Sequence, residues 1–232
     1  MENSGVKQKI AKWISLRLIF AILLFILSLF VFVTITDEIV LEHESGFDNS
    51  ISNAILSLQS PLATKIFVTF TFFGSSTFLL PAYSLLVLIF LFKKNWKRAL
   101  DVASIGITST SLLYLLKDIF KRQRPLNPLI RHVTGFSFPS GHSFSSFTFC
   151  GIIVYLVWLS GISKAWKVIV TTVLFLFATT IAFSRVYLRV HYPSDVIAGF
   201  CLSMIWLVIS IWLLHFTDKK FFKQTVESNN ME

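Results

Sequence analysis

Two polar segments interrupt an otherwise strongly apolar chain of 232 residues. The first covers residues 117–142 and the second covers residues 184–195. Each ends in a short motif that combines histidine, proline and serine, "PSGH" at 139–142 and "HYPSD" at 191–195. Histidine is the side chain whose ordinary pKa lies near neutral pH, so it can accept or release a proton during a reaction. The two segments therefore contain the candidates for acid–base or nucleophilic chemistry.

His191 and Asp195 are four residues apart, on either side of a proline at which the last apolar stretch begins. An aspartate in the first turn of a helix there can accept the Nδ1 proton of His191, which fixes the tautomer and leaves Nε2 as a nucleophile or base. His142 supplies a second imidazole at the beginning of another apolar stretch. Two imidazoles that face one anion site, one of them oriented by a carboxylate, indicate phosphoryl transfer, in which one ring attacks phosphorus and the other protonates the leaving oxygen.

The surroundings of both histidines predict an anion site. Pro139 and Pro193 each precede an apolar stretch, and proline suits the first turn of a helix, where its missing N–H costs little. Each helix then presents free backbone N–H groups and the positive end of its dipole. Glycine permits close approach of a ligand, and arginine matches phosphate oxygens in pairs. The residues that we expect to hold a phosphate-sized anion are Lys117, Arg124, Ser140, Gly141 and Arg185.

Taken singly, these residues also have ordinary explanations. Lys117, Arg122 and Arg131 can anchor helix ends at the level of lipid headgroups. Asp195 can be an acid in the first turn of a helix, and Ser140 can be a helix cap. The joint spacing of the whole set favours a functional site.

The rest of the chain is composed of apolar stretches that fit membrane helices. Hydrophobic residues make up 54% of the chain and charged residues 14%, against about 25% charged in ordinary soluble domains. A spanning helix needs ~20 mostly apolar residues. The predicted spans are residues 16–36, 76–92, 99–116, 140–160, 165–183 and 194–216. Residues 63–73 are expected to form an outer or tilted helix, separated from the second span by a break at Gly74.

The predicted fold is thus an all-α polytopic membrane protein with six transmembrane helices in a single domain, residues 1–232, with a motif core at 117–195. Cys150 and Cys201 fall inside apolar stretches and are expected to be small core residues. A short helix on the outer surface is also expected from an apolar face. That face consists of Phe47, Ile51, Ile55 and Leu58, with Asp48 elsewhere on the helix.

The distribution of charge predicts the orientation. Six spans place both termini on one side of the membrane, and with that side cytoplasmic, 13 of the 21 cations lie inside. Seven further cations are concentrated in residues 117–131 and 185–189 on the other side, an exception so local that it indicates function. We therefore expect a multi-pass protein of the cytoplasmic membrane with an extracytoplasmic site. Loop cations explain the net charge of +9 without a nucleic-acid partner.

The motifs in combination resemble the three-part signature of the type-2 phosphatidic acid phosphatase superfamily, with no departure at the signature positions. They are Lys117-x6-Arg124-Pro125, Pro139-Ser140-Gly141-His142 and Ser184-Arg185-x5-His191-x3-Asp195. The resemblance implies that His191 is a nucleophile that forms a phosphohistidine, that Asp195 is its partner, and that His142 protonates the departing alcohol. It implies that the five anion-site residues hold the phosphoryl oxygens. It also implies that no metal or other cofactor is needed, and the sequence agrees, since no carboxylate cluster suited to Mg²⁺ lies near these motifs.

The expected function is hydrolysis of a phosphate monoester or diphosphate on a membrane lipid, with release of inorganic phosphate. The candidate substrates are phosphatidylglycerophosphate, phosphatidic acid, undecaprenyl diphosphate and lipid A, and the small six-span form favours a bacterial envelope lipid. A phosphotransferase with the same phosphohistidine is the main alternative. A vanadium haloperoxidase is disfavoured because those enzymes are soluble and much longer. A transporter is disfavoured because the spans are almost free of charge.

Overall fold

The computed structural model describes residues 2–42, 45–130 and 133–229, and within these ranges the chain is helical, without strands. Arg131 lies outside the described residues. The helices are α1 (Glu2–Thr34), the π-helical η1 (Ile35–Leu41), α2 (Gly46–Leu56), α3 (Pro61–Phe72), α4 (Ser76–Phe92), α5 (Trp96–Phe120), α6 (Gly141–Leu159), α7 (Lys164–Tyr187) and α8 (Pro193–Asn229). The predicted all-α fold is confirmed.

Among the residues that the structure describes, five helical segments are long and apolar enough to cross a membrane. They are Leu18–Val40, Trp96–Phe120, Gly141–Leu159, Lys164–Tyr187 and Pro193–Phe216. The pair α3 and α4, bent by 41° at a short break, gives a sixth span if it is counted as one. The break lies at the predicted glycine, and α4 has the predicted bounds of Ser76–Phe92.

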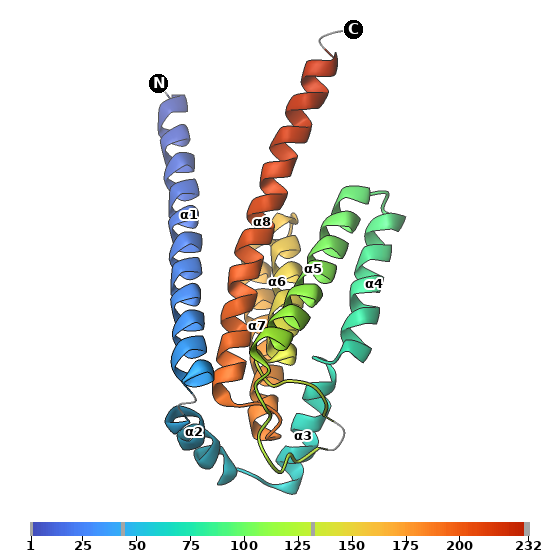
Figure 1. The fold of residues 1–232 in the computed structure, drawn as a ribbon. Coiled ribbons are helices and arrows are strands. Elements are labelled where there is room, and N and C mark those ends of the chain that lie inside the picture. The colour runs from blue at the N-terminus through green and yellow to red at the C-terminus, as the bar shows by residue number, and fades with distance from the viewer. Residues whose placement is uncertain (1, 43–44, 131–132, 230–232) are drawn as a thin grey trace.

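The helices stand side by side, as Figure 1 shows, with the beginning of α1 and the end of α8 at the same end of the bundle. Helix α2, helix α3 and the segment that joins α5 to α6 lie at the opposite end. Helix α6 packs against both α7 and α8, while α1 packs against α8 and α4 packs against α5. This arrangement brings the two predicted polar segments to one end of the bundle.

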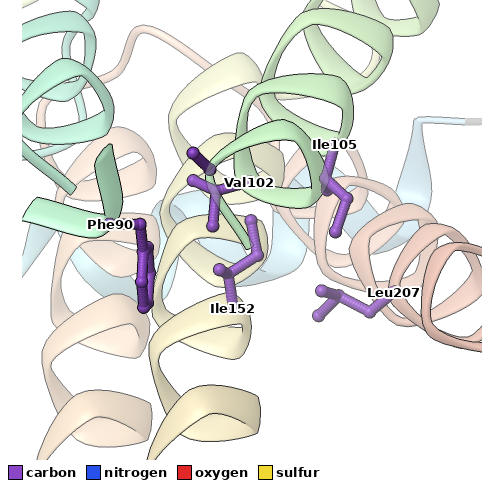
Figure 2. Close-up of a cluster of buried hydrophobic side chains, with 6 residues drawn as sticks. Phe90, Val102, Ile105, Ile152 and Leu207 are labelled. Carbon is purple, nitrogen blue, oxygen red and sulfur yellow. The ribbon is translucent and has the colours of Figure 1, made fainter. Parts of the chain in front are cut away.

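The bundle is held by tight contacts between helices. A Cβ atom added at Gly199 of α8 would lie 2.7 Å from the backbone oxygen of Ser140, so α8 passes very close to the beginning of α6. Farther along, Figure 2 shows an apolar cluster that joins α4, α5, α6 and α8. Its members include Phe90, Val102, Ile105, Ile152 and Leu207. Because lipid is as apolar as these side chains, their close van der Waals packing stabilises the association of the helices. Cys150 and Cys201 are both buried and free, as expected.

The predicted short helix is present as α2, and Ile51 and Ile55 of its predicted apolar face pack in one cluster with residues of the 186–190 segment. Asp48 is completely buried, whereas Phe47 is 45% exposed and Leu58 is 64% exposed. The reason is that the Asp48 carboxylate forms an ion pair with Arg122, with an Nη2–Oδ2 distance of 2.7 Å. A specific polar contact with the bundle, and not apolar periodicity alone, decides which side of α2 faces inward.

Candidate active site

The beginnings of α6 and α8 lie together and bring the two histidine motifs into one place. Pro193 is the first residue of α8, as predicted. Ser140 is the N-cap of α6, and its Oγ accepts a hydrogen bond from the backbone N–H of Ser143 at 3.4 Å. The backbone N–H of Ser140 donates to the backbone oxygen of Asp195 at 3.0 Å. The two helix beginnings are therefore joined by a direct backbone hydrogen bond.

His191 is held in the orientation that its spacing to Asp195 predicts. Its Nδ1 lies 3.4 Å from Oδ2 of Asp195, and its Nε2 lies 3.0 Å from Nη1 of Arg124. A guanidinium can only donate, so Nε2 accepts and Nδ1 carries the proton that faces the carboxylate. Burial lowers the pKa of His191 to about 3, although the hydrogen bond and charge of Asp195 oppose the shift. The ring is therefore neutral at neutral pH and has a lone pair at Nε2.

Asp195 is fixed by a set of donors. Oδ2 accepts hydrogen bonds from the hydroxyl of Ser137 and from the backbone N–H of Tyr192, the latter at 2.9 Å. Oδ1 accepts from Nη1 of Arg122 at 2.7 Å. Asp195 is completely buried, so these contacts determine how the carboxylate meets His191.

Arg122 and Ser137 are missing from the residues that the sequence predicts for the site. The alternative of Arg122 as a headgroup anchor is wrong, because its side chain is only 14% exposed and pairs with two carboxylates. Burial lowers the pKa of Arg122, but the charges and hydrogen bonds of Asp195 and Asp48 outweigh this effect, and the net shift is upward. One feature of the sequence could have indicated a role for Arg122 in the site, namely its position two residues before Arg124.

Arg124 is anchored by backbone carbonyls around the site. Its Nε donates to Gly135 at 2.9 Å, its Nη1 donates to Val190 at 2.7 Å, and its Nη2 donates to Thr134 at 3.1 Å. Burial lowers its pKa, and the charge of Asp195 opposes this shift. These contacts direct one edge of the guanidinium toward the Nε2 atom of His191.

Lys117 and Arg185 complete a cationic cluster. The Nζ atom of Lys117 donates to the backbone oxygen of Phe136 at 2.7 Å. Nη1 of Arg185 donates to Oγ1 of Thr71 in α3 at 2.5 Å. Arg185 is only 3% exposed, and its Nε is buried with no hydrogen-bond partner among the described residues. A buried donor of this kind is unfavourable unless an acceptor completes it, and an anion would also relieve the repulsion among the three cations.

These groups surround one cavity of about 980 Å³. Its polar end is lined by the predicted site residues Lys117, Arg124, Gly141, His142, Arg185 and His191. Asp195 lies behind His191 and outside the cavity lining. Ser140 is completely buried as the cap of α6 and does not line the cavity, so its side chain supports the helix beginning. The cavity continues between apolar side chains that include Val68, Phe72, Leu79, Leu80 and Leu113.

The break between α3 and α4 forms part of the wall beside His142. A Cβ atom added at Gly74 would lie 2.9 Å from Cδ2 of His142 and 2.5 Å from Cγ2 of Ile181. The glycine that bends α3 away from α4 therefore also leaves space for the second imidazole. Its effect on the span was predicted from the sequence, and its contact with the site was not.

No group of three or more His, Cys, Asp or Glu side chains that could hold a metal ion occurs within the described ranges. Positive charge at the cavity instead comes from Lys117, Arg124 and Arg185. Independence from metal stays an expectation for experiment.

The geometry agrees with comparisons to known proteins. The family model of the PAP2 superfamily matches residues 98–219. Phosphatidylglycerophosphatase B of Bacillus subtilis (strain 168) is 35% identical over 165 residues, which cover 68% of this chain and 78% of that protein. Lipid A 4'-phosphatase of Bacteroides thetaiotaomicron is 30% identical over 175 residues, which cover 68% of this chain and 73% of that protein.

A solved structure shares the fold as well. The crystal structure of a transmembrane PAP2 type phosphatidylglycerolphosphate phosphatase from Bacillus subtilis aligns with a TM-score of 0.69 and 29% identity. The alignment covers 86% of this chain and 96% of that chain. The resemblance found in the sequence motifs is thereby confirmed. The chain belongs to the PAP2 superfamily and is a phosphatase of this family.

Proposed function

We propose that this chain hydrolyses a phosphate monoester or diphosphate on a membrane lipid at the outer face of the cytoplasmic membrane, through a phosphohistidine at His191. The observation that carries the proposal is the 3.0 Å contact between Nη1 of Arg124 and Nε2 of His191. It gives the ring the tautomer of a nucleophile and places a phosphate-binding cation beside the attacking atom.

The first step forms the bond between Nε2 of His191 and phosphorus and breaks the bond between phosphorus and the lipid oxygen. His142 gives its proton to that oxygen, so the lipid leaves as a neutral alcohol or as a lipid phosphate. The phosphorylated ring of His191 becomes positively charged, and the carboxylate of Asp195 beside Nδ1 stabilises this charge.

In the second step a water molecule attacks phosphorus and passes a proton to His142. The bond between phosphorus and Nε2 breaks, the electron pair returns to His191, and inorganic phosphate is released. Both histidines thereby regain their initial protonation states. If an alcohol other than water takes the phosphoryl group, the same steps give a phosphotransferase.

The cations provide the electrostatic part of the catalysis. Lys117, Arg124 and Arg185 surround the polar end of the cavity, where the oxygens of a transferring phosphoryl group carry negative charge. The Nε of Arg185, which has no partner in the described part of the chain, is available to one such oxygen. Binding of phosphate also replaces the contact of Arg124 with Nε2, which exposes the lone pair at the moment it is needed.

The shape of the cavity supports a lipid as the substrate. Its cationic end is continuous with apolar walls from α3, α4 and α5, which include Phe72, Leu79, Leu80 and Leu113. A phosphate bound to the cations therefore leaves an apolar chain beside membrane helices. The relatives named for phosphatidylglycerophosphate and lipid A favour a phosphorylated envelope lipid. Thirteen of the 21 cations lie on the side of both termini, which favours the cytoplasm for that side and the outer face for the site.

A phosphate-release assay tests the proposal. The protein, purified in mild detergent, is given phosphatidylglycerophosphate, phosphatidic acid, undecaprenyl diphosphate, lipid A or a water-soluble phosphate ester, with EDTA present. We expect phosphate from at least one lipid and none with His191→Ala. Transfer to an added alcohol without phosphate release would establish the phosphotransferase instead. Equal rates of wild type and His191→Ala would exclude the phosphohistidine mechanism.

A further inference from the structure

The guanidinium of Arg122 bridges two buried carboxylates from distant parts of the chain. Nη1 donates to Oδ1 of Asp195 at 2.7 Å, and Nη2 donates to Oδ2 of Asp48 at 2.7 Å. Both carboxylates are completely buried. Asp195 belongs to the site described above, whereas Asp48 belongs to α2, outside the three sequence motifs. Arg122 thus connects α2 to the carboxylate that orients the proposed nucleophile.

Asp48 also binds the beginning of α8. Its Oδ1 accepts the backbone N–H of Ser194 at 2.8 Å, and its Oδ2 accepts the hydroxyl of Ser194 at 2.7 Å. Ser194 directly precedes Asp195, and its Oγ also accepts a hydrogen bond from Nη1 of Arg122 at 2.8 Å. A carboxylate at a helix N-terminus is favourable because it meets unpaired N–H groups and the positive end of the dipole. Asp48 therefore caps α8 from another helix.

The position of the Arg122 fork depends on this arrangement. The guanidinium lies over the ring of Tyr192, with 4.2 Å from its central carbon to the ring centroid. With Asp48 present, Nη2 of the Arg122 guanidinium is bound to Asp48 of α2, and Nη1 is bound to Oδ1 of Asp195. Oδ2 of Asp195, which also accepts from Ser137 and Tyr192, then faces Nδ1 of His191. Asp48 also shares the positive charge of Arg122, so Asp195 keeps negative charge to stabilise a phosphorylated, cationic imidazole.

We infer that Asp48 is a positioning residue of the phosphatase reaction, which acts through Arg122 on Asp195 and thereby on His191. This inference rests on the proposed role of His191 as nucleophile. It assigns α2 a part in catalysis without contact between α2 and the substrate. If Asp48 served packing alone, its loss would reduce the amount of folded protein and leave the turnover of each folded molecule unchanged.

A double-mutant cycle tests the inference. The variants are Asp48→Asn, Arg122→Lys and their combination, and the matched control is Asn53→Ala at an exposed position of α2. Asparagine keeps the volume of Asp48 and loses its charge. Lysine keeps the charge of Arg122 and loses the fork that reaches two carboxylates. For each variant, kcat and KM are measured with a water-soluble phosphate ester and with the lipid substrate, beside the midpoint of thermal unfolding.

We expect Asp48→Asn to lower kcat about tenfold for both substrates, which corresponds to ~1.4 kcal/mol, with KM changed less than kcat. In the Arg122→Lys protein, adding Asp48→Asn has little further effect on kcat, because the effects of substituting residues that act through one another are not additive. Asn53→Ala keeps the wild-type kcat.

Two outcomes would overturn the inference. The first is wild-type kcat in folded Asp48→Asn. The second is that the losses of activity in the two single variants add in the double variant and follow the amount of folded protein. If Asp48→Asn does not fold, Arg122→Lys decides, because it retains both buried carboxylates and a cation between them. Folded Arg122→Lys with wild-type kcat would then contradict the inference. A failure of the proposed function is recognised separately, by turnover in His191→Ala.

Discussion

Nη1 of Arg124 lies 3.0 Å from Nε2 of His191, so the proposed attacking atom is paired with one of the cations that line the cavity. The same Nη1 donates to the backbone oxygen of Val190 at 2.7 Å, which fixes the guanidinium independently of the imidazole. Arg124 can therefore exchange the histidine lone pair for a phosphate oxygen without leaving its place. Preorganised donors of this kind act on the transition state without reorganisation during the reaction.

The substitution Asp195→Asn tests the orientation of His191. Asparagine offers one acceptor oxygen where Ser137, Tyr192 and Arg122 all donate to the carboxylate, and it cannot compensate a cationic imidazole. We expect kcat to fall by ~10²–10⁴-fold, the usual range of a general acid–base contribution, with a measurable rate remaining. The assay is phosphate release at saturating substrate. The control is Asp101→Asn. Asp101 pairs with Lys97 near the beginning of α5, and its substitution should keep the wild-type kcat. A wild-type rate in Asp195→Asn would show that the carboxylate is dispensable.

The buried His191 also makes stability depend on pH. Its pKa is about 3 in the folded protein against 6.5 ordinarily, so between these values the unfolded chain binds a proton that the folded chain does not. The free energy of unfolding therefore falls as the pH is lowered from about 6.5 towards 3. We expect the midpoint of thermal unfolding in detergent to fall between pH 7 and pH 4, and to fall less in His191→Gln. An identical decrease in both proteins would mean that His191 does not contribute to acid sensitivity.

Gly74→Ala tests whether the break between α3 and α4 positions the second imidazole. The added methyl group would stand 2.9 Å from Cδ2 of His142, so the ring must move. Displacement by about 1 Å can cost ~10²-fold in rate, and we expect a decrease in kcat of about 10–10²-fold. Gly161→Ala is the matched control, since an added Cβ there has nothing within 4 Å. Equal kcat values in the two variants would exclude a role of the break in catalysis.

Labelling of single cysteines on intact cells tests the proposed orientation. Leu126 is 81% exposed and belongs to the segment between α5 and α6, which lies at the end of the bundle that contains the site. Lys93 is exposed at the opposite end, after α4. We expect a membrane-impermeant thiol reagent to label Leu126→Cys and not Lys93→Cys until the cells are opened. The native Cys150 and Cys201 are buried and give little background. The reverse pattern would place the site on the cytoplasmic side.

The sequence predicts much of this fold because its main signals are local. Apolar length specifies the helices, proline marks the beginning of α8, and Gly74 marks the break before α4. The four-residue spacing of His191 and Asp195 correctly predicts that they meet at the beginning of α8. Each of these signals depends on residues that are near one another along the chain.

The missed contacts join distant segments. Arg122 and Asp48 are 74 residues apart in sequence, and Arg185 and Thr71 are 114 apart. Polar residues of this kind resemble surface residues until the packing of the helices buries them. Asp48 in particular is expected away from the apolar face of α2, and that pattern does not predict its burial in an ion pair with the bundle.

The central claim is the bond between phosphorus and His191, and trapping it is the most direct measurement. Wild-type protein is mixed with a lipid substrate labelled in the phosphoryl group, quenched within one turnover in alkali, where phosphohistidine survives, and digested for mass spectrometry. We predict a phosphoryl group on His191 that appears and decays at the rate of phosphate release, and that is absent from His191→Ala. Normal phosphate release without such a species, or a phosphoryl group on another residue, would contradict the mechanism.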